Sequence, residues 1–222
     1  VAPALYLMRK ETADALKAFV ANGGTLVTGY NTGIVEEHNL CHTGEWPGEG
    51  LMEVFGIWNE ECDYPRGNPV NAMTHGENPL GLSGTYELNH ACEMIHARGA
   101  TVLATYQSDF YAGQPVLTQH TYGSGQVYYL ASRPEARFFN DFYRALAKSL
   151  ELERPLPVDL PEGVTVQHRT DGVRTFIFVL NFTPGEQVLP LGDIQLKSLI
   201  DGHELTGSAK LKPLHADVYE RV

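Results

Sequence analysis

The sequence predicts an α/β domain followed by a small antiparallel β-domain. The first 30 residues alternate between strand-like and helix-like patterns, as in a βαβ unit. Residues 164–169 instead alternate with a period of two, and residues 176–182 carry apolar side chains on two faces, as strands do. Pro155 and Pro157 separate the two regions as a linker. We therefore expect domains at residues 1–153 and 154–222.

The N-terminal elements carry the α/β prediction. The apolar run Val1–Met8 predicts a strand buried on both faces. A helix is expected over Glu11–Asn22, ended by Gly23 and Gly24, with its apolar stripe formed by Ala13, Leu16, Phe19 and Val20. A strand follows at Thr25–Tyr30. Because the chain opens without a methionine or a polar lead-in, we expect that Val1 lies inside a domain.

The rest of the first domain combines loops, strands and a final helix. Gly, Pro, Asn and acidic residues dominate Asn31–Pro79, which is expected to be mostly irregular and to serve as functional or interface loops. Strands are expected at Tyr86–His96 and Thr101–Tyr106, and a hairpin turns at Gly123-Ser124-Gly125. Phe138, Phe142, Leu146 and Leu150 recur every four residues and predict a helix over 136–150.

The second domain reads as strands and turns throughout. The alternation over 164–169 and the apolar run over 176–182, with a turn at Asp171-Gly172, predict a β-hairpin. Further turns are expected at Pro184-Gly185 and Asp201-Gly202. These patterns predict a small antiparallel β-domain.

Composition excludes several classes of function. Hydrophobic residues make up 43% of the 222 residues, enough for a buried core. Acidic residues outnumber basic ones by 27 to 16, and the net charge of −11 disfavours binding to nucleic acid. No apolar run approaches the roughly 18–20 residues of a membrane span. Three widely spaced cysteines fit a reducing compartment. We expect a cytoplasmic protein that binds neither nucleic acid nor membrane.

Candidate catalytic and metal-binding patterns are weak. Cys41, Cys62 and Cys92 do not lie on a glycine-flanked elbow between a strand and a helix, where a nucleophilic cysteine is expected. His38, Cys41 and His42 could meet one metal ion on spacing alone, but a second pair of ligands is missing. Ordinary loop polarity is therefore the preferred interpretation of these residues.

Acidic pairs and the glycine-rich turn do not indicate chemistry either. Glu36-Glu37 and Glu60-Glu61 are adjacent residues, whereas glycosidase carboxylates face each other across a sugar at about 5–10 Å. Gly123-Ser124-Gly125 joins two strands and is not followed by a lysine, so it is not expected to hold phosphate.

Aromatic residues in the predicted loops are more informative. Trp46, Trp58, Phe110 and Tyr111 lie in or beside these loops. Tyrosine and tryptophan in such positions are typical both of protein interfaces and of platforms for sugars. The residues alone leave both interpretations open.

Several short segments occur in an order shared with one enzyme family. The first group comprises Val1–Tyr6, Phe19–Val27, Thr32–Val35, Tyr86–Leu88, Ala104–Tyr106, Asp109–Gly113 and Tyr122–Tyr129. The second group comprises Gly163-Val164, His168-Arg169 and Leu180–Thr183. The first resembles the middle domain of glycoside hydrolase family 42 β-galactosidases, and the second resembles their C-terminal β-domain.

The resemblance implies a parent with three domains. These are a (β/α)₈ barrel with the two catalytic glutamates of a retaining mechanism, a flavodoxin-like (class I amidotransferase-like) α/β trimerisation domain, and the β-domain. The barrel has no counterpart in these 222 residues, and the α/β domain is expected to lack its first strand and helix. The family's cysteine-bound metal also belongs to the barrel.

We therefore expect a non-catalytic assembly fragment of a β-galactosidase that hydrolyses terminal β-D-galactosides. The chain is expected to supply no catalytic, cofactor-binding or metal-binding residue and to form a homotrimer through its α/β domain. It would meet the galactoside only through the barrel. Loops 31–79 and 107–114, including Trp46, Trp58, Phe110 and Tyr111, are expected to contact neighbouring subunits or to form a wall of the cleft.

Two other functions stay open from the residues. A stand-alone carbohydrate-binding protein would use Trp46 or Trp58 as a platform. An amidotransferase-like enzyme would use Cys41 or Cys92 as its nucleophile, against which the absent elbow argues.

Overall fold

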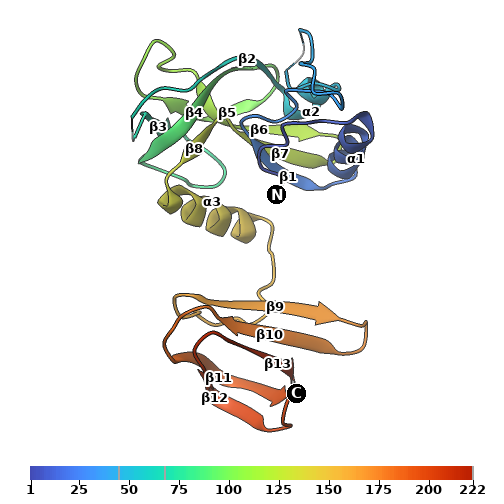
Figure 1. The fold of residues 1–222 in the computed structure, drawn as a ribbon, viewed down its shortest axis with the longest axis vertical. Coiled ribbons are helices and arrows are strands. Elements are labelled where there is room, and N and C mark those ends of the chain that lie inside the picture. Colours follow the sequence, from blue (N-terminus) through green and yellow to red (C-terminus); the bar gives the residue numbers. More distant parts are fainter. Residues whose placement is uncertain (45, 68, 222) are drawn as a thin grey trace. The chain divides into compact units, whose positions relative to one another are not determined.

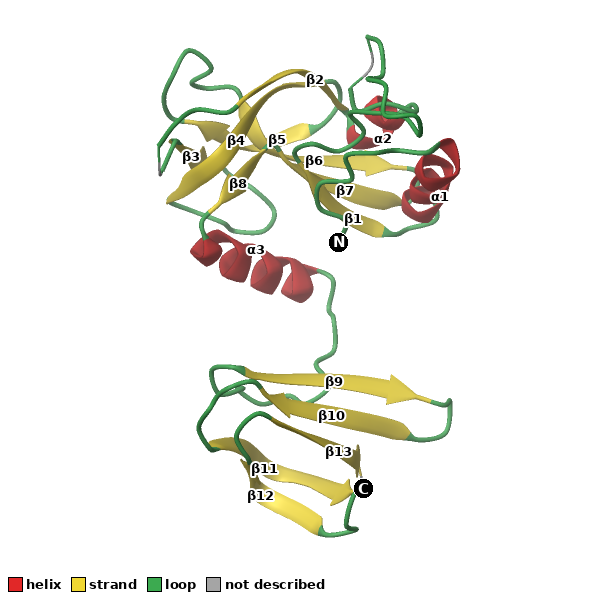
Figure 2. Cartoon of the chain, in the orientation of Figure 1, coloured by secondary structure: helices red, strands yellow, loops and turns green. Residues whose placement is uncertain are grey.

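The chain is described from a computed structural model that places residues 1–44, 46–67 and 69–221. These residues divide into two compact units, Val1–Leu150 and Glu151–Val222 (Figure 1). The first unit combines helices and strands, whereas the second consists of strands and loops (Figure 2). Each unit is described by itself.

The first unit contains most of the regular elements. Its helices are α1 (Lys10–Ala21), α2 (Leu51–Phe55) and α3 (Ala136–Ser149). Its strands are β1 (Thr25–Gly29), β2 (Ile57–Asp63), β3 (Asn71–His75), β4 (Thr85–Ala97), β5 (Thr101–Tyr106), β6 (Pro115–Tyr122), β7 (Gly125–Leu130) and β8 (Ser132–Pro134). The helix predicted over 11–22 and the one predicted over 136–150 are confirmed to within one residue at each end.

The sheet of the first unit is mixed. Its strand order is β1-β7-β6-β5-β3-β4-β2, and β8 pairs with β4. β1 runs parallel to β7, in register from Thr25 opposite Gln126 to Gly29 opposite Leu130. The other pairings between the described strands of this sheet are antiparallel. The first unit is thus a mixed sheet with few helices, and a flavodoxin-like arrangement, which has a largely parallel sheet, is not confirmed.

Part of this sheet closes on itself. β3 pairs with both β4 and β5, β5 pairs with β6, and β6 pairs with β7. One residue after β7, the chain enters β8, which returns to β4 through Cys92 opposite Ser132. Side chains from this closed part and from α3 form one buried cluster that includes Met73, Tyr86, Leu88, Leu103, Tyr106, Leu117, Phe138 and Phe142.

A second cluster joins α1 and α2 to β1 and β7. It contains Met8, Ala13, Val20, Leu26, Leu51, Phe55, Ile57, Val127 and Tyr129. The predicted apolar stripe of α1 is therefore confirmed at Ala13 and Val20, but Phe19 is exposed. Leu16 packs against the cluster and is only partly buried.

The opening segment does not form the buried strand that its apolar run predicts. Pro3 and Ala4 lie in a turn, and Ala4 has a positive φ of 48°. Isolated bridges pair Ala2 with Thr28 of β1 and Leu7 with Val35 in the loop after β1, but the segment forms no continuous strand among the described residues. The turn interrupts the extended backbone, so apolar side chains such as Tyr6 and Leu7 are left exposed.

The prediction of a mostly irregular stretch over Asn31–Pro79 is also wrong in part. This stretch contains α2, β2 and β3. β2 is antiparallel to β4, from Ile57 opposite Ala97 to Asp63 opposite Cys92. A strand stabilised by partners 29–40 positions away in sequence leaves a weak local signal, because strand preference depends on the neighbouring strands.

The second unit is an antiparallel sheet, as predicted. Its strands are β9 (Val164–Thr170), β10 (Thr175–Asn181), β11 (Gln187–Ser198), β12 (Glu204–Leu211) and β13 (His215–Arg221). They pair in the order β12-β11-β13-β10-β9. Ile177 and Val179 of β10 point into its buried cluster, whereas Phe176 and Phe178 on the other face are only partly buried.

Candidate functional site

Trp58 lies at the start of β2, at the edge of the sheet. Its indole ring stacks on the imidazole of His96 in β4, with ring centroids 4.9 Å apart and planes at 24°. The guanidinium carbon of Arg98 lies 5.2 Å from the Trp58 ring centroid, within the range of a cation–π contact. His96 Nε2 also lies 2.7 Å from a carboxylate oxygen of Glu60. An aromatic ring and charged side chains are thus held together at this edge.

Trp46 lies close to the same strand. Its backbone carbonyl accepts a hydrogen bond from the N–H of Asn59, at 2.9 Å. The indole Nε1 of Trp46 is buried and has no hydrogen-bond acceptor in the described part of the chain. The structure therefore places both tryptophans near the beginning of β2.

Phe110 and Tyr111 lie in the loop between β5 and β6, near the other end of β2. Phe110 is 75% exposed, and its N–H donates to the Asp109 carboxylate at 2.7 Å. Tyr111 is fully buried, packs edge-on against Tyr106, and donates its hydroxyl to Asp63 at 3.4 Å. Of this pair, only Phe110 offers exposed surface to another molecule.

The four aromatic residues do not converge on one pocket. Trp46 and Trp58 lie beside the first residues of β2, and Tyr111 contacts the last residue, Asp63. Seven residues of strand span about 20 Å. The aromatic residues are therefore distributed along the edge strand, an arrangement that suits an extended contact surface better than a small-molecule site.

Sequence reasoning missed a buried carboxylate in β4. Glu93 is fully buried; it accepts a hydrogen bond from the N–H of Asn31 at 2.8 Å and another from the Tyr129 hydroxyl at 2.7 Å. Burial raises the pKa of Glu93 to about 7, which these hydrogen bonds partly oppose. Residues 91–95 are buried on both faces of β4, so the alternation that marks a half-buried strand is absent there.

Asn31, the partner of Glu93, occupies the middle of a tight turn. The turn follows β1 and reads Gly29-Tyr30-Asn31-Thr32-Gly33, and Asn31 has a left-handed φ of 60°. This is the spacing of the turn that presents a nucleophile in hydrolases, but such a turn leads into a helix and carries a serine or cysteine. Here an amide stands at the central position and loop follows, so the turn does not supply a nucleophile.

The cysteines lack the environment of a nucleophile. Cys92 is buried, and burial raises the pKa of its thiol. The pKa of the partly buried Cys62 is raised to about 12, chiefly by desolvation. Cys41 is exposed in the loop that follows this turn. A thiol becomes reactive when its pKa is lowered, so this arrangement does not support the amidotransferase-like alternative.

The polar loop residues considered for a metal are separated by their contacts. His38 pairs with Glu36 at 2.8 Å, whereas the ring of His42 packs against Gly48. In residues 1–44, 46–67 and 69–221, no three His, Cys, Asp or Glu side chains are grouped so that they could hold a metal ion. None of the described helices is both long and apolar enough to cross a membrane.

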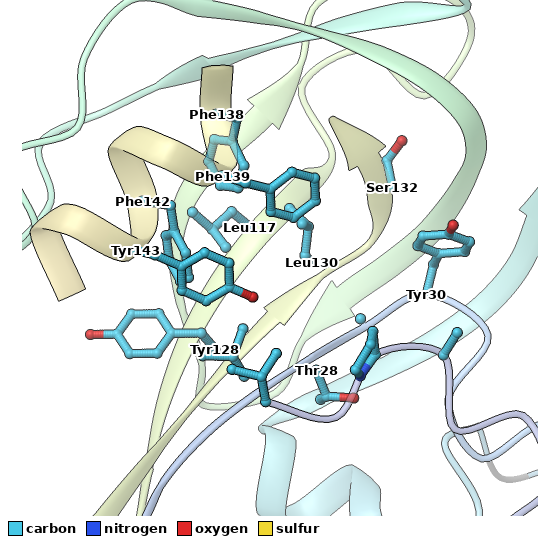
Figure 3. Close-up of a pocket in the computed structure, with 15 residues that line it drawn as sticks. Thr28, Tyr30, Leu117, Tyr128, Leu130, Ser132, Phe138, Phe139, Phe142 and Tyr143 are labelled. Atoms are coloured by element: carbon cyan, nitrogen blue, oxygen red, sulfur yellow. The ribbon is translucent and has the colours of Figure 1, made fainter. Parts of the chain in front are cut away.

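An apolar cavity of about 70 Å³ lies between α3 and the N-terminal segment. Figure 3 shows Phe138, Phe139, Phe142 and Tyr143 of α3 on one side of it and Thr28 and Tyr30 on the other. The described residues that line it include no carboxylate, histidine or cysteine. Hydroxyl groups such as that of Ser132 line the cavity, but among the described lining residues no histidine or carboxylate could act as the base that would activate them.

Comparison with known families matches most of the chain, in two parts. Residues 1–153 match the β-galactosidase trimerisation domain, and residues 163–221 match the β-galactosidase C-terminal domain. β-Galactosidase Pbg of Clostridium perfringens is 42% identical over 222 residues, and β-galactosidase BglY of Alicyclobacillus acidocaldarius is 39% identical over 223 residues. Each match covers 100% of this chain but 32% of the relative, so the chain spans about a third of these proteins.

Solved structures show the same relationship. The crystal structure of β-galactosidase from Bacillus circulans sp. alkalophilus superposes with a TM-score of 0.88 at 35% identity, over 99% of this chain and 32% of that chain. The β-galactosidase from Rahnella sp. R3 gives a TM-score of 0.86 at 40% identity, with the same coverage of both chains. The chain therefore belongs to the glycoside hydrolase family 42 β-galactosidases and comprises their trimerisation and C-terminal domains.

Proposed function

We propose that this chain is the assembly portion of a β-galactosidase. Residues 1–153 hold subunits together as a homotrimer, and residues 154–222 form the C-terminal β-domain. The observation that carries the proposal is the match of residues 1–153 to the β-galactosidase trimerisation domain. A flavodoxin-like origin of the α/β layer is part of the proposal, supported by α1 and the parallel β1–β7 pair.

Hydrolysis of terminal β-D-galactosides, with retention of configuration, is assigned to the complete enzyme. The chain spans about a third of its relatives. A retaining mechanism needs two carboxyl groups about 5 Å apart across the sugar. The carboxylates described above are engaged otherwise: Glu93 is buried against Tyr129, and Glu36 and Glu60 each pair with a histidine. These engagements support placing the catalytic glutamates in the part of the relatives that this chain does not match, and no cofactor is assigned to this chain.

Contacts between subunits are assigned to the edge of β2 and the loops beside it. Trp46, Trp58 and Phe110 supply the aromatic surface, and Tyr111 supports Phe110 from the core. Tryptophan, tyrosine and arginine are enriched at protein interfaces, and the stacking of Trp58 with His96 near Arg98 fits that composition. A cytoplasmic location is proposed as well, supported by unpaired Cys41, Cys62 and Cys92.

Two measurements on the 222-residue chain test the proposal. Light scattering after size exclusion is expected to give a mass about three times 24.5 kDa, and a chromogenic galactoside is expected to show no turnover. Galactoside turnover by this chain alone would overturn the assignment. Phe110→Ala is expected to weaken the trimer, while Phe19→Ala, also an exposed phenylalanine, is the matched control.

A further inference from the structure

Three elements of the first unit bring aromatic side chains together at the surface. We call Tyr30, Asn31, Tyr64 and His90 the tyrosine–histidine cluster. The His90 ring lies edge-on to Tyr30, with centroids 6.1 Å apart, and edge-on to Tyr64, at 5.6 Å. The Tyr64 hydroxyl donates to Oδ1 of Asn31 at 2.9 Å. Residues from the end of β1, the end of β2 and the middle of β4 therefore form one connected group.

The cluster is exposed although its members are aromatic. Tyr64 is 52% exposed, His90 is exposed and Tyr30 is half-buried. His90 lies between Leu88 and Cys92, where the pairing of β4 with β8 shifts register. Such irregularities commonly redirect a side chain away from the regular face of a sheet. Exposed rings at an irregularity indicate a contact surface rather than part of the core.

The cluster is held in place from below. The N–H of Asn31 donates to the buried carboxylate of Glu93, which also accepts from Tyr129. Thr32 Oγ1 donates to the carbonyl of Gly29 at 2.6 Å and closes the turn. Because these contacts already order the turn, a partner that binds here loses little conformational entropy.

We propose that the tyrosine–histidine cluster is a contact surface between copies of this chain. The inference rests on the proposed function, because the match of residues 1–153 to a trimerisation domain is what points to a second copy as the partner. Tyrosine is enriched in interface cores, where its rigid ring buries a large area and its hydroxyl still forms hydrogen bonds.

The distribution of charge also favours a second copy of this chain as the partner of the cluster. Two copies that each carry −11 repel each other, so their contact should form where the surface holds few carboxylates. The side chains of the cluster carry no carboxylate, and Glu93 beneath it is fully buried. The rings of Tyr30 and Tyr64 stand at 69° and 67° to His90, so the cluster presents edges and hydroxyls rather than one flat face on which a sugar could stack.

Sedimentation velocity of the 222-residue chain over a range of concentrations tests the proposal. Tyr64→Ala is expected to raise the concentration of half-assembly at least tenfold. Tyr6→Ala removes a tyrosine of similar exposure, 48%, outside the cluster and is expected to change that concentration less than twofold. Circular dichroism checks that both variants keep the fold. If Tyr64→Ala loses the fold, His90→Glu replaces an exposed side chain and is expected to dissociate the copies by adding a like charge.

The outcomes separate this inference from the proposed function. A native chain that stays monomeric contradicts the proposed trimer and this inference with it. A native trimer that is unaffected by both Tyr64→Ala and His90→Glu contradicts this inference alone. The proposal would be overturned by a third result, in which neither substitution changes assembly but galactose or lactose shifts the NMR resonances of the His90 ring. That result would assign the cluster to sugar binding.

Discussion

The carboxylate of Glu93 accepts a hydrogen bond from the phenol of Tyr129, and both side chains are completely buried between β4 and β7. The backbone N–H of Asn31 supplies the second hydrogen bond described above. This contact ties the turn after β1 to the centre of the sheet. It also places an ionisable group where its charge is costly.

Replacing Glu93 by glutamine should change how stability depends on pH. The folded-state pKa of Glu93 is raised from 4.5 to about 7, so the folded state binds more protons than the unfolded state between these values. The group therefore favours folding below about pH 4.5, and this contribution is lost as pH rises through 7. Urea unfolding is expected to show Glu93→Gln less stable than the native chain at pH 5, with the difference smaller at pH 8.

The control for that experiment is Glu77→Gln, which removes a carboxylate from the exposed loop after β3. It should leave the slope of unfolding free energy against pH unchanged between 5 and 8. Equal slopes for the native chain and Glu93→Gln would show that Glu93 does not titrate in this range.

Tyr129→Phe should lower stability by leaving a buried carboxyl oxygen without its donor. Such a loss costs about 1–3 kcal/mol in the free energy of unfolding. Tyr143→Phe is the matched control, because Tyr143 is a half-buried tyrosine whose hydroxyl makes no hydrogen bond to another described residue. Thermal unfolding of both variants checks the prediction, and equal melting temperatures would argue against a structural role for the phenol.

Phe138→Ala should be among the most damaging core changes. The Phe138 ring is fully buried and packs against Tyr86 and Phe142, with centroids 5.3 and 5.4 Å away. Truncating a buried phenylalanine costs about 3–5 kcal/mol. Its neighbour Phe139 is only partly buried, so Phe139→Ala should cost clearly less. The denaturant midpoints of the two variants check this prediction. A larger loss of stability for Phe139→Ala than for Phe138→Ala would contradict the burial of the Phe138 face of α3.

Gly125→Ala should strain the hairpin between β6 and β7. A Cβ at this position would overlap with the carbonyl oxygens of Val20 and Gly24. Overpacking of this kind costs about 1–3 kcal/mol. Gly76 lies in the same unit with nothing within 4 Å of an added Cβ, so Gly76→Ala should be nearly neutral. Differential scanning calorimetry of both variants checks the prediction. A melting temperature of Gly125→Ala equal to that of the native chain would contradict the placement of α1 against this turn.

Local patterns predicted the elements whose stability is local. The hairpin of β6 and β7 follows from alternating side chains around Gly123-Ser124-Gly125, and α3 follows from its phenylalanine spacing. β2 escaped prediction because Asn59, Glu60 and Glu61 disfavour a strand, and only the pairing of Asn59 and Glu61 with β4 overrides that preference. The apolar run Val1–Met8 gave a wrong prediction of a buried strand, because apolar residues also occur in turns. Here a turn begins at Pro3.

The candidate site was predictable only in part. Aromatic loop residues pointed to Trp58 and Phe110, which the structure leaves partly or largely exposed, but the pattern did not separate Phe110 from its buried neighbour Tyr111. The contact of Asn31 with Glu93 joins residues 62 positions apart, and such a long-range pairing leaves no local pattern.

The mass of the 222-residue chain in solution tests the central claim most directly. Sedimentation equilibrium is expected to give about three times 24.5 kDa, with dissociation only on dilution. A mass of 24.5 kDa at every concentration, from a chain whose circular dichroism and cooperative unfolding show that it is folded, would contradict the assignment of residues 1–153 as the element that assembles the enzyme.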